Sequence, residues 1–165
     1  MMPEFEQWVA FNTAVAGAGA ALGGLLIVAL SVNIKLIAES PGLAARAGAS
    51  IAGLILGVAL CCLALIPGQT LLGYGPQVLI GAIVCGVLAV LAARALRRDS
   101  SRDGYHQFDA VNILTFSLPI ALFLIGGGLA LAGLPAALVV VAVGSIVAII
   151  STVLFSWVAL VEVLR

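Results

Sequence analysis

Charged side chains are scarce in this chain: Asp, Glu, Lys and Arg make up 8% of its 165 residues, against roughly 25% in an ordinary globular domain. A water-soluble domain of this size could not cover its surface with so few charges. The apolar residues, 64% of the chain, instead form long blocks. A helix that crosses a bilayer needs about 20 such residues, so the sequence predicts an integral membrane protein.

The residue patterns of metal sites and catalytic centres are also missing. The cysteines Cys61, Cys62 and Cys85 lie in apolar blocks without metal-ligand spacing, and the single histidine, His106, lies in a polar segment. The sequence has no pair of intramembrane histidines for a haem, no Ser/His/Asp set and no phosphate-binding loop. No chain of carboxylates crosses the apolar blocks, which disfavours a proton pump. We expect no enzymatic activity, no cofactor, no metal and no nucleic-acid partner.

Five apolar blocks predict an all-α, polytopic helical bundle that forms a single transmembrane domain over residues 1–165. The N-terminal MMPEFEQW carries two glutamates and no basic residue, unlike the start of a cleavable signal peptide. The first block is therefore expected to be retained as a span. Proline and glycine punctuate the chain where helices should stop or start. The expected helices cover residues 8–37, 43–66, 77–96, 110–132 and 136–164.

The basic residues predict the orientation. With five spans, all seven fall on one face of the membrane, whereas the second and fourth connections carry no charge. Short loops rich in Lys and Arg stay cytoplasmic. We therefore expect the N-terminus outside and the C-terminus in the cytoplasm. The preference for Arg over Lys, with abundant Ala, Gly, Val and Leu, suggests a high-GC bacterial genome, so the expected location is a bacterial plasma (inner) membrane. The residues concerned are Lys35, Arg46, Arg94, Arg97, Arg98, Arg102 and Arg165.

Residues 70–77, TLLGYGPQ, contain the Gly-Tyr-Gly tripeptide of potassium-channel selectivity filters. Leu71 occupies the place of the filter threonine, and Pro67-Gly68 leaves no room for the pore helix that supports a filter. Two glycines suit backbone positions with positive φ, and Pro76 can open a helix. The stretch is therefore expected to form a turn, with Tyr74 at the level of the lipid headgroups.

Small and polar residues share one face on several predicted helices, projected at about 100° per residue. Such stripes let backbones approach closely and let hydroxyls or amides bond across the contact. Packing within one bundle is the first interpretation, and a face for a partner protein or a narrow polar pathway is the second. The packing glycines are Gly19, Gly23, Gly53, Gly57 and Gly126, and the polar members include Asn112, Thr115, Ser145, Thr152 and Ser156.

Polar residues near the expected cytoplasmic ends are candidates for further contacts. Asn33 and Lys35 close the first helix, and Lys35 can extend to water. Arg46 lies on a small-residue face and is a candidate partner of Glu162, with lipid headgroups, Glu39 or Asp109 as alternatives. Deeper in the fourth helix, Pro119 cannot donate to the Thr115 carbonyl, so we expect a kink there, as a structural feature or as a hinge.

Four stretches of the first half carry a resemblance. They are Phe5-x-x-Trp8-x-x-Phe11, AGAGAALGGLLIVALSVNIKLI at 16–37, PGLAARA at 41–47 and IPGQ at 66–69. Together they resemble a group of small actinobacterial membrane proteins with five helices and no assigned activity, some of them labelled modulator of FtsH protease. The resemblance covers mainly the first two helices. It implies a bacterial plasma membrane and a non-catalytic role, and it assigns no site residues.

These observations favour a protein that acts through helix–helix contacts, as an accessory or assembly subunit of a larger complex or as a homo-oligomer. Its expected partners are the lipid bilayer and either another membrane protein or a second copy. The alternative is a small oligomeric channel or transporter whose pore is lined by the same stripes. Binding of a lipid or quinone between helices is a third possibility.

Overall fold

The computed structural model describes residues 3–32, 34–35, 41–99 and 106–163, which form a helical bundle without strands in these ranges. The all-helical architecture expected from the composition is confirmed. Within the described residues the bundle has six helices: α1 (Pro3–Glu6), α2 (Val9–Val32), α4 (Pro41–Ala64), α5 (Leu71–Asp99), α6 (His106–Leu131) and α7 (Ala136–Val163).

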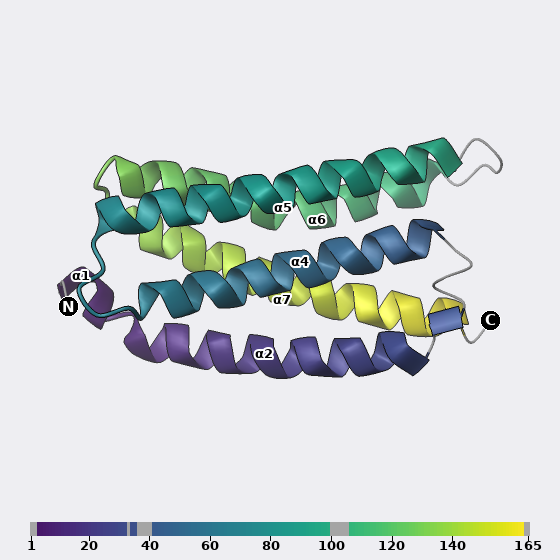
Figure 1. Cartoon of the computed structure of the whole chain (residues 1–165), viewed down its shortest axis with the longest axis horizontal. Helices are drawn as coiled ribbons and strands as arrows, with labels where there is room; N and C mark the ends of the chain where they lie inside the picture. The colour runs from purple at the N-terminus through teal and green to yellow at the C-terminus, as the bar shows by residue number, and fades with distance from the viewer. Residues whose placement is uncertain (1–2, 33, 36–40, 100–105, 164–165) are drawn as a thin grey trace.

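The five long helices run up and down, each antiparallel to the next, with the N-terminus at one end of the bundle and the C-terminus at the other (Figure 1). Each long helix packs on the next one along the chain, and α7 returns to pack on α2 and α4. Helix α4 contacts all four of the other long helices, so it is the central element. Helix α2 lies along one edge and the α5–α6 pair along the opposite edge.

Four helices have described stretches that are long and apolar enough to cross a membrane: Val9–Val32, Ala47–Ala64, Leu71–Leu91 and Ala136–Trp157. The apolar stretch described in α6, Ser117–Leu131, is shorter. Large aliphatic side chains such as Leu25, Ile80 and Ile150 are exposed on the outside of the bundle. An apolar exterior is what a bilayer requires, and the structure is consistent with a multi-pass membrane protein.

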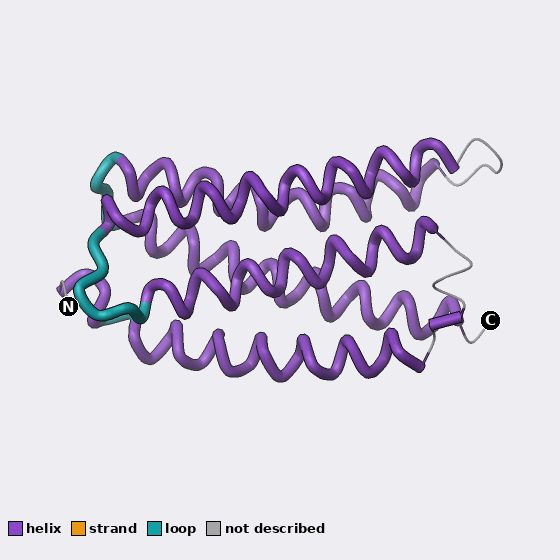
Figure 2. Tube along the Cα trace, viewed as in Figure 1, coloured by secondary structure: helices purple, strands orange, loops and turns teal. Residues whose placement is uncertain are grey.

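Two connections, residues 65–70 and 132–135, lie at the same end as the N-terminus (Figure 2). At the second connection Gly133 adopts a φ of 71°, and the amide of Leu134 bonds the carbonyl of Leu129 at 3.0 Å. This arrangement is a Schellman cap, in which glycine supplies the left-handed residue that ends a helix. Pro135 follows directly, so the sequence signals at this turn are realised in the structure.

The predicted turn at Gly73-Tyr74-Gly75 is wrong, because helix α5 begins at Leu71 and includes the tripeptide. Thr70 is the N-cap: its Oγ1 accepts the amide of Gly73 at 3.1 Å, and its carbonyl accepts the amide of Tyr74 at 2.8 Å. A threonine cap satisfies an amide that would otherwise lack a partner at the helix start. The described glycines with positive φ are Gly68 and Gly133, and neither belongs to the tripeptide.

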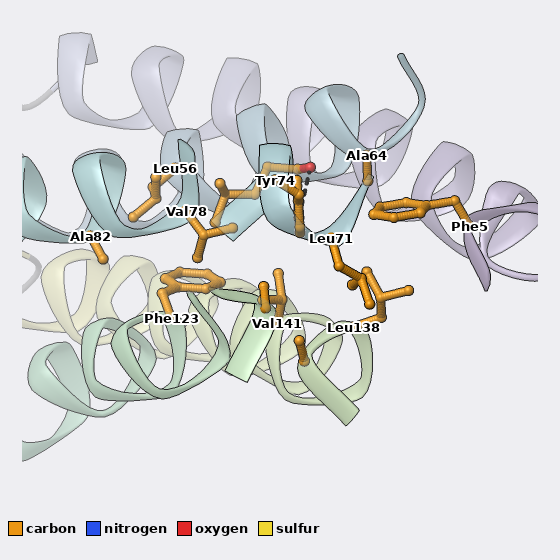
Figure 3. Close-up of a cluster of buried hydrophobic side chains, with 13 residues drawn as sticks. Phe5, Leu56, Ala64, Leu71, Tyr74, Val78, Ala82, Phe123, Leu138 and Val141 are labelled. Carbon is orange, nitrogen blue, oxygen red and sulfur yellow. Dashed lines mark hydrogen bonds between the residues drawn. The ribbon is translucent and has the colours of Figure 1, made fainter. Parts of the chain in front are cut away.

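Tyr74 points into the bundle instead of toward the lipid headgroups. Its side chain is 1% exposed, its hydroxyl donates to the carbonyl of Leu60 at 3.1 Å, and its ring meets Phe5 of α1 edge to face, with centroids 5.6 Å apart (Figure 3). Leu71 and Leu138 belong to the same buried cluster. Helix α1 thus closes the N-terminal end of the bundle through Phe5.

Replacement of Tyr74 tests this position. We expect Tyr74→Ala to lower the free energy of unfolding by about 3–5 kcal/mol, because it empties a buried aromatic site. Tyr74→Phe should cost about 1 kcal/mol, for the bond to Leu60 alone. The measurement is unfolding in detergent followed by circular dichroism. Leu72→Ala, at a neighbouring side chain that is 66% exposed, is the control, and a Tyr74→Ala effect no larger than that of the control would contradict the buried position.

Candidate functional site

Buried polar side chains gather along the contact between α4 and α7, and we call this set the polar seam: Ser50 and Cys61 of α4 with Ser145, Ser151 and Thr152 of α7. All five are at most 5% exposed. Buried hydroxyls in an apolar bundle need hydrogen-bond partners, because unmade bonds are costly there. The polar seam is therefore the most chemically distinctive part of the described interior.

The hydroxyls of α7 bond to carbonyls of their own helix and reach toward α4. Ser145 Oγ donates to the Val141 carbonyl at 3.1 Å, and Cys61 Sγ lies 3.9 Å from Ser145 Oγ. Thr152 Oγ1 is 2.8 Å from the Ala148 carbonyl and 3.3 Å from the Ser50 carbonyl. Bonding back to the carbonyl four residues earlier satisfies a serine or threonine within a helix. The contact to Ser50 then links the two helices.

A small cavity adjoins the polar seam near mid-length of the bundle, where α4, α5, α6 and α7 meet, and we call it the mid-bundle cavity. The space open to the centre of a water molecule is about 10 Å³. Ser50 Oγ, which lines it, is a buried polar atom without a hydrogen-bond partner among the described residues. Residues from all four helices contribute: Ser50, Gly53, Cys85, Pro119, Ser151 and Thr152.

Four of the five glycines singled out in the sequence lie against a neighbouring helix. A Cβ on Gly23 would meet Leu54 of α4 at 3.6 Å, and the corresponding position on Gly19 lies against Val58 and Leu54. Gly57 lies opposite Ser145, 3.6 Å from its Cα. Small residues thus allow α4 to approach both α2 and α7 closely.

Gly126 is the fourth glycine at a helix contact, and Gly53 is the exception. Gly126 of α6 is close to Val141 of α7, with 3.3 Å from its Cβ position to the backbone nitrogen of Val141. Gly53 has no atom within 4 Å of its Cβ position and lines the mid-bundle cavity instead of a helix contact.

The predicted ionic contacts fall largely outside the described part of the structure. Residue Asn33 is not described, and neither are the side chains of Arg46, Asn112, Thr115 and Glu162. The Arg46–Glu162 pair therefore stays a prediction, although the backbone places both residues at the same end of the bundle. Lys35 is exposed at that end. Thr152 is 3% exposed and belongs to the polar seam.

Sequence reasoning missed a pair of amides at the opposite end. Gln69 is 8% exposed, and its Nε2 donates to the Leu63 carbonyl at 3.1 Å and to Gln77 Oε1 at 2.9 Å. The pair joins the connection after α4 to the second turn of α5. The available signal was that glutamines are rare in so apolar a chain, but spacing alone does not show that two of them meet.

The polar seam and the mid-bundle cavity offer hydroxyl and thiol groups, of which Ser145, Thr152 and Cys85 donate to backbone carbonyls. Among the described residues, no three His, Cys, Asp or Glu side chains gather in a way that could hold a metal ion. The geometry therefore suits the joining of helices and the binding of a small polar molecule.

No protein-family model, no curated protein and no solved structure matches this chain. The inference of function depends on the residues and contacts described above.

The contact between α6 and α7 can be tested with two glycines of α6. A Cβ at Gly126 would lie 2.6 Å from a methyl group of Val141, whereas one at Gly128 meets nothing within 4 Å. We expect Gly126→Ala to destabilise the protein by about 1–3 kcal/mol through overpacking and Gly128→Ala to leave stability nearly unchanged. Thermal unfolding of both variants in the same detergent measures the difference, and equal midpoints would show that α6 and α7 are not packed this closely.

Proposed function

We propose that this chain is a five-span protein of a bacterial plasma membrane that acts through helix–helix contacts, without catalysis, as an accessory or assembly subunit or as a homo-oligomer. The outer face of α2 carries this proposal. Of the four apolar spans, α2 is the least covered: 11% of its apolar window is buried inside the bundle, against 50% for α7.

Helix α2 has small residues on two opposite faces. The inner face, with Gly19 and Gly23, packs on α4. The outer face carries Gly17, Ala20, Ala21 and Gly24, which are all exposed, and neither of its glycines has an atom within 4 Å of its Cβ position. Because lipid is as apolar as leucine, a lipid-facing helix gains nothing from small residues, whereas a helix–helix contact does. A second helix from outside this chain would fit the outer face.

The end-to-end distribution of charge supports the five-span threading. Lys35, Arg46, Arg94, Arg97 and Arg98 all belong to helix ends at the same end of the bundle, while Glu4 and Glu6 of α1 lie at the other end. Short basic segments favour the cytoplasmic side. The resemblance to small actinobacterial membrane proteins agrees with a bacterial plasma membrane and a non-catalytic role.

The alternative, an oligomeric channel or transporter, would need a polar path that water can reach. Ser145 and Thr152 are 1% and 3% exposed and bond to backbone carbonyls, which supports packing within one copy. A path could still form between copies.

Bulky substitutions on the outer face of α2 test the proposed contact. We expect the double variant Gly17→Leu and Gly24→Leu to lose at least tenfold of the bound partner, or of the oligomer, recovered from native membranes in mild detergent, because leucine side chains keep the backbones apart. Gly128→Leu, at an exposed glycine of α6 with equally open surroundings, is the matched control. Mass spectrometry identifies what is bound.

A stoichiometric second protein would support the accessory role, whereas an oligomer of this chain alone would favour the channel alternative and call for flux assays. Full recovery of the complex from the double variant would contradict a contact through α2.

The threading has its own test. In a background without cysteine, a membrane-impermeant maleimide added to intact cells with a permeable outer envelope should label Gln7→Cys, because Gln7 is exposed at the N-terminal end. Arg94→Cys, exposed at the other end, should react only after the membrane is opened. Gln7 and Arg94 are separated by three proposed spans, α2, α4 and α5. Labelling of both variants from outside would place them on the same side of the membrane and would contradict that odd number of spans.

A further inference from the structure

The hydroxyl of Ser50 stands apart from the other members of the polar seam. Ser145 and Thr152 donate to carbonyls, but Ser50 Oγ has no hydrogen-bond partner in the described part of the chain, although the side chain is 3% exposed. A buried hydroxyl without a partner is costly. Such a group in a native structure indicates a ligand or an ordered water.

The mid-bundle cavity beside Ser50 has the size for one such molecule. A buried water needs about 10–15 Å³, measured as space open to its centre, and two to four polar partners. The cavity provides about 10 Å³, which excludes a larger ligand. Thr152 Oγ1, which also lines it, has lone pairs that can accept a further bond.

Helix α6 supplies a further acceptor. Pro119, whose ring lines the mid-bundle cavity, has no amide hydrogen, so the Thr115 carbonyl lacks its usual helical donor. A helical carbonyl points toward the backbone nitrogen four residues later, so the Thr115 carbonyl is directed toward Pro119, which lines the cavity. Ordered water is one of the means by which membrane helices satisfy carbonyls released by proline.

We propose that the mid-bundle cavity binds a single water molecule that accepts a hydrogen bond from Ser50 Oγ and donates to the Thr115 carbonyl and to Thr152 Oγ1. The water bridges α4, α6 and α7 at the proline break of α6. Helices α4 and α6 pack only sparsely on each other, and the bridge adds a polar link between them. This inference is independent of the proposed function.

The sign of a stability change tests the bridge. If the cavity were dry, Ser50→Ala would remove a hydroxyl without a partner, and the unfolding midpoint would rise or stay constant. With the water present, the variant loses a hydrogen bond of the bridge, and we expect the midpoint to fall by about 2–4 °C. Ser31→Ala is the control, because Ser31 is exposed and bonds only the Ile27 carbonyl of its own helix at 2.7 Å; it should leave the midpoint unchanged.

A second measurement detects the water itself. Hydroxyl radicals produced by X-ray pulses from a bound water oxidise the side chains that touch it. We expect oxidation of Pro119, a buried residue, in detergent-solubilised protein, and none of Phe123, which is intrinsically more reactive but 0% exposed and outside the cavity lining. Gly53→Ala adds a methyl group where the cavity has open space, so it should reduce Pro119 oxidation at least fivefold by displacing the water.

The proposal is overturned if Pro119 stays unmodified, if Gly53→Ala leaves its oxidation unchanged, or if Ser50→Ala fails to lower the midpoint relative to Ser31→Ala.

Discussion

The close approach of α4 and α7 is the contact on which the rest of the bundle depends. Helix α4 touches every other long helix, and α7 closes the bundle against α2, α4 and α6. In lipid the hydrophobic effect does not drive helices together, so packing and hydrogen bonds must hold them. Gly57 opposite Ser145 provides the close packing, and Thr152 reaching the Ser50 carbonyl provides a polar link. Both require small side chains at the crossing.

The buried hydroxyls of the bundle differ in whether they have a hydrogen-bond partner. Ser145 and Thr152 donate hydrogen bonds to carbonyls of their own helix, so the apolar contact around them is not disrupted. Ser50 Oγ has no such partner in the described part of the chain and lies beside the mid-bundle cavity, at the depth where Pro119 leaves a carbonyl of α6 without its usual donor. A buried hydroxyl without a partner among the described residues, a carbonyl that lacks its usual helical donor and a space the size of one water occur together there, and the proposed bridging water would account for all three.

On the exterior of the bundle, small residues recur at positions where the described part of this chain provides no contact. On α2 the same residue types serve an inner face that packs on α4 and an outer face that is exposed. The lateral association proposed above uses this outer face, and it leaves the polar groups of the interior free for packing. The proposed partner contact and the proposed water site thus lie on separate parts of the molecule.

The sequence by itself determined the helical, apolar architecture and the break between the helices that end near residue 132 and begin near residue 136. The hydropathy of a segment and its local turn preferences act without distant partners. The tertiary structure decided the conformation of Gly73-Tyr74-Gly75, which is helical. Two glycines and a proline favoured a turn, but the Thr70 cap and the burial of Tyr74 against Phe5 and the Leu60 carbonyl outweighed them. It also decided that Gly57 meets Ser145 while Gly53 borders a cavity, although both lie on one helix face. The Thr70 cap is local, but the burial of Tyr74 and the surroundings of Gly53 and Gly57 depend on residues far away in the sequence, which no local pattern specifies.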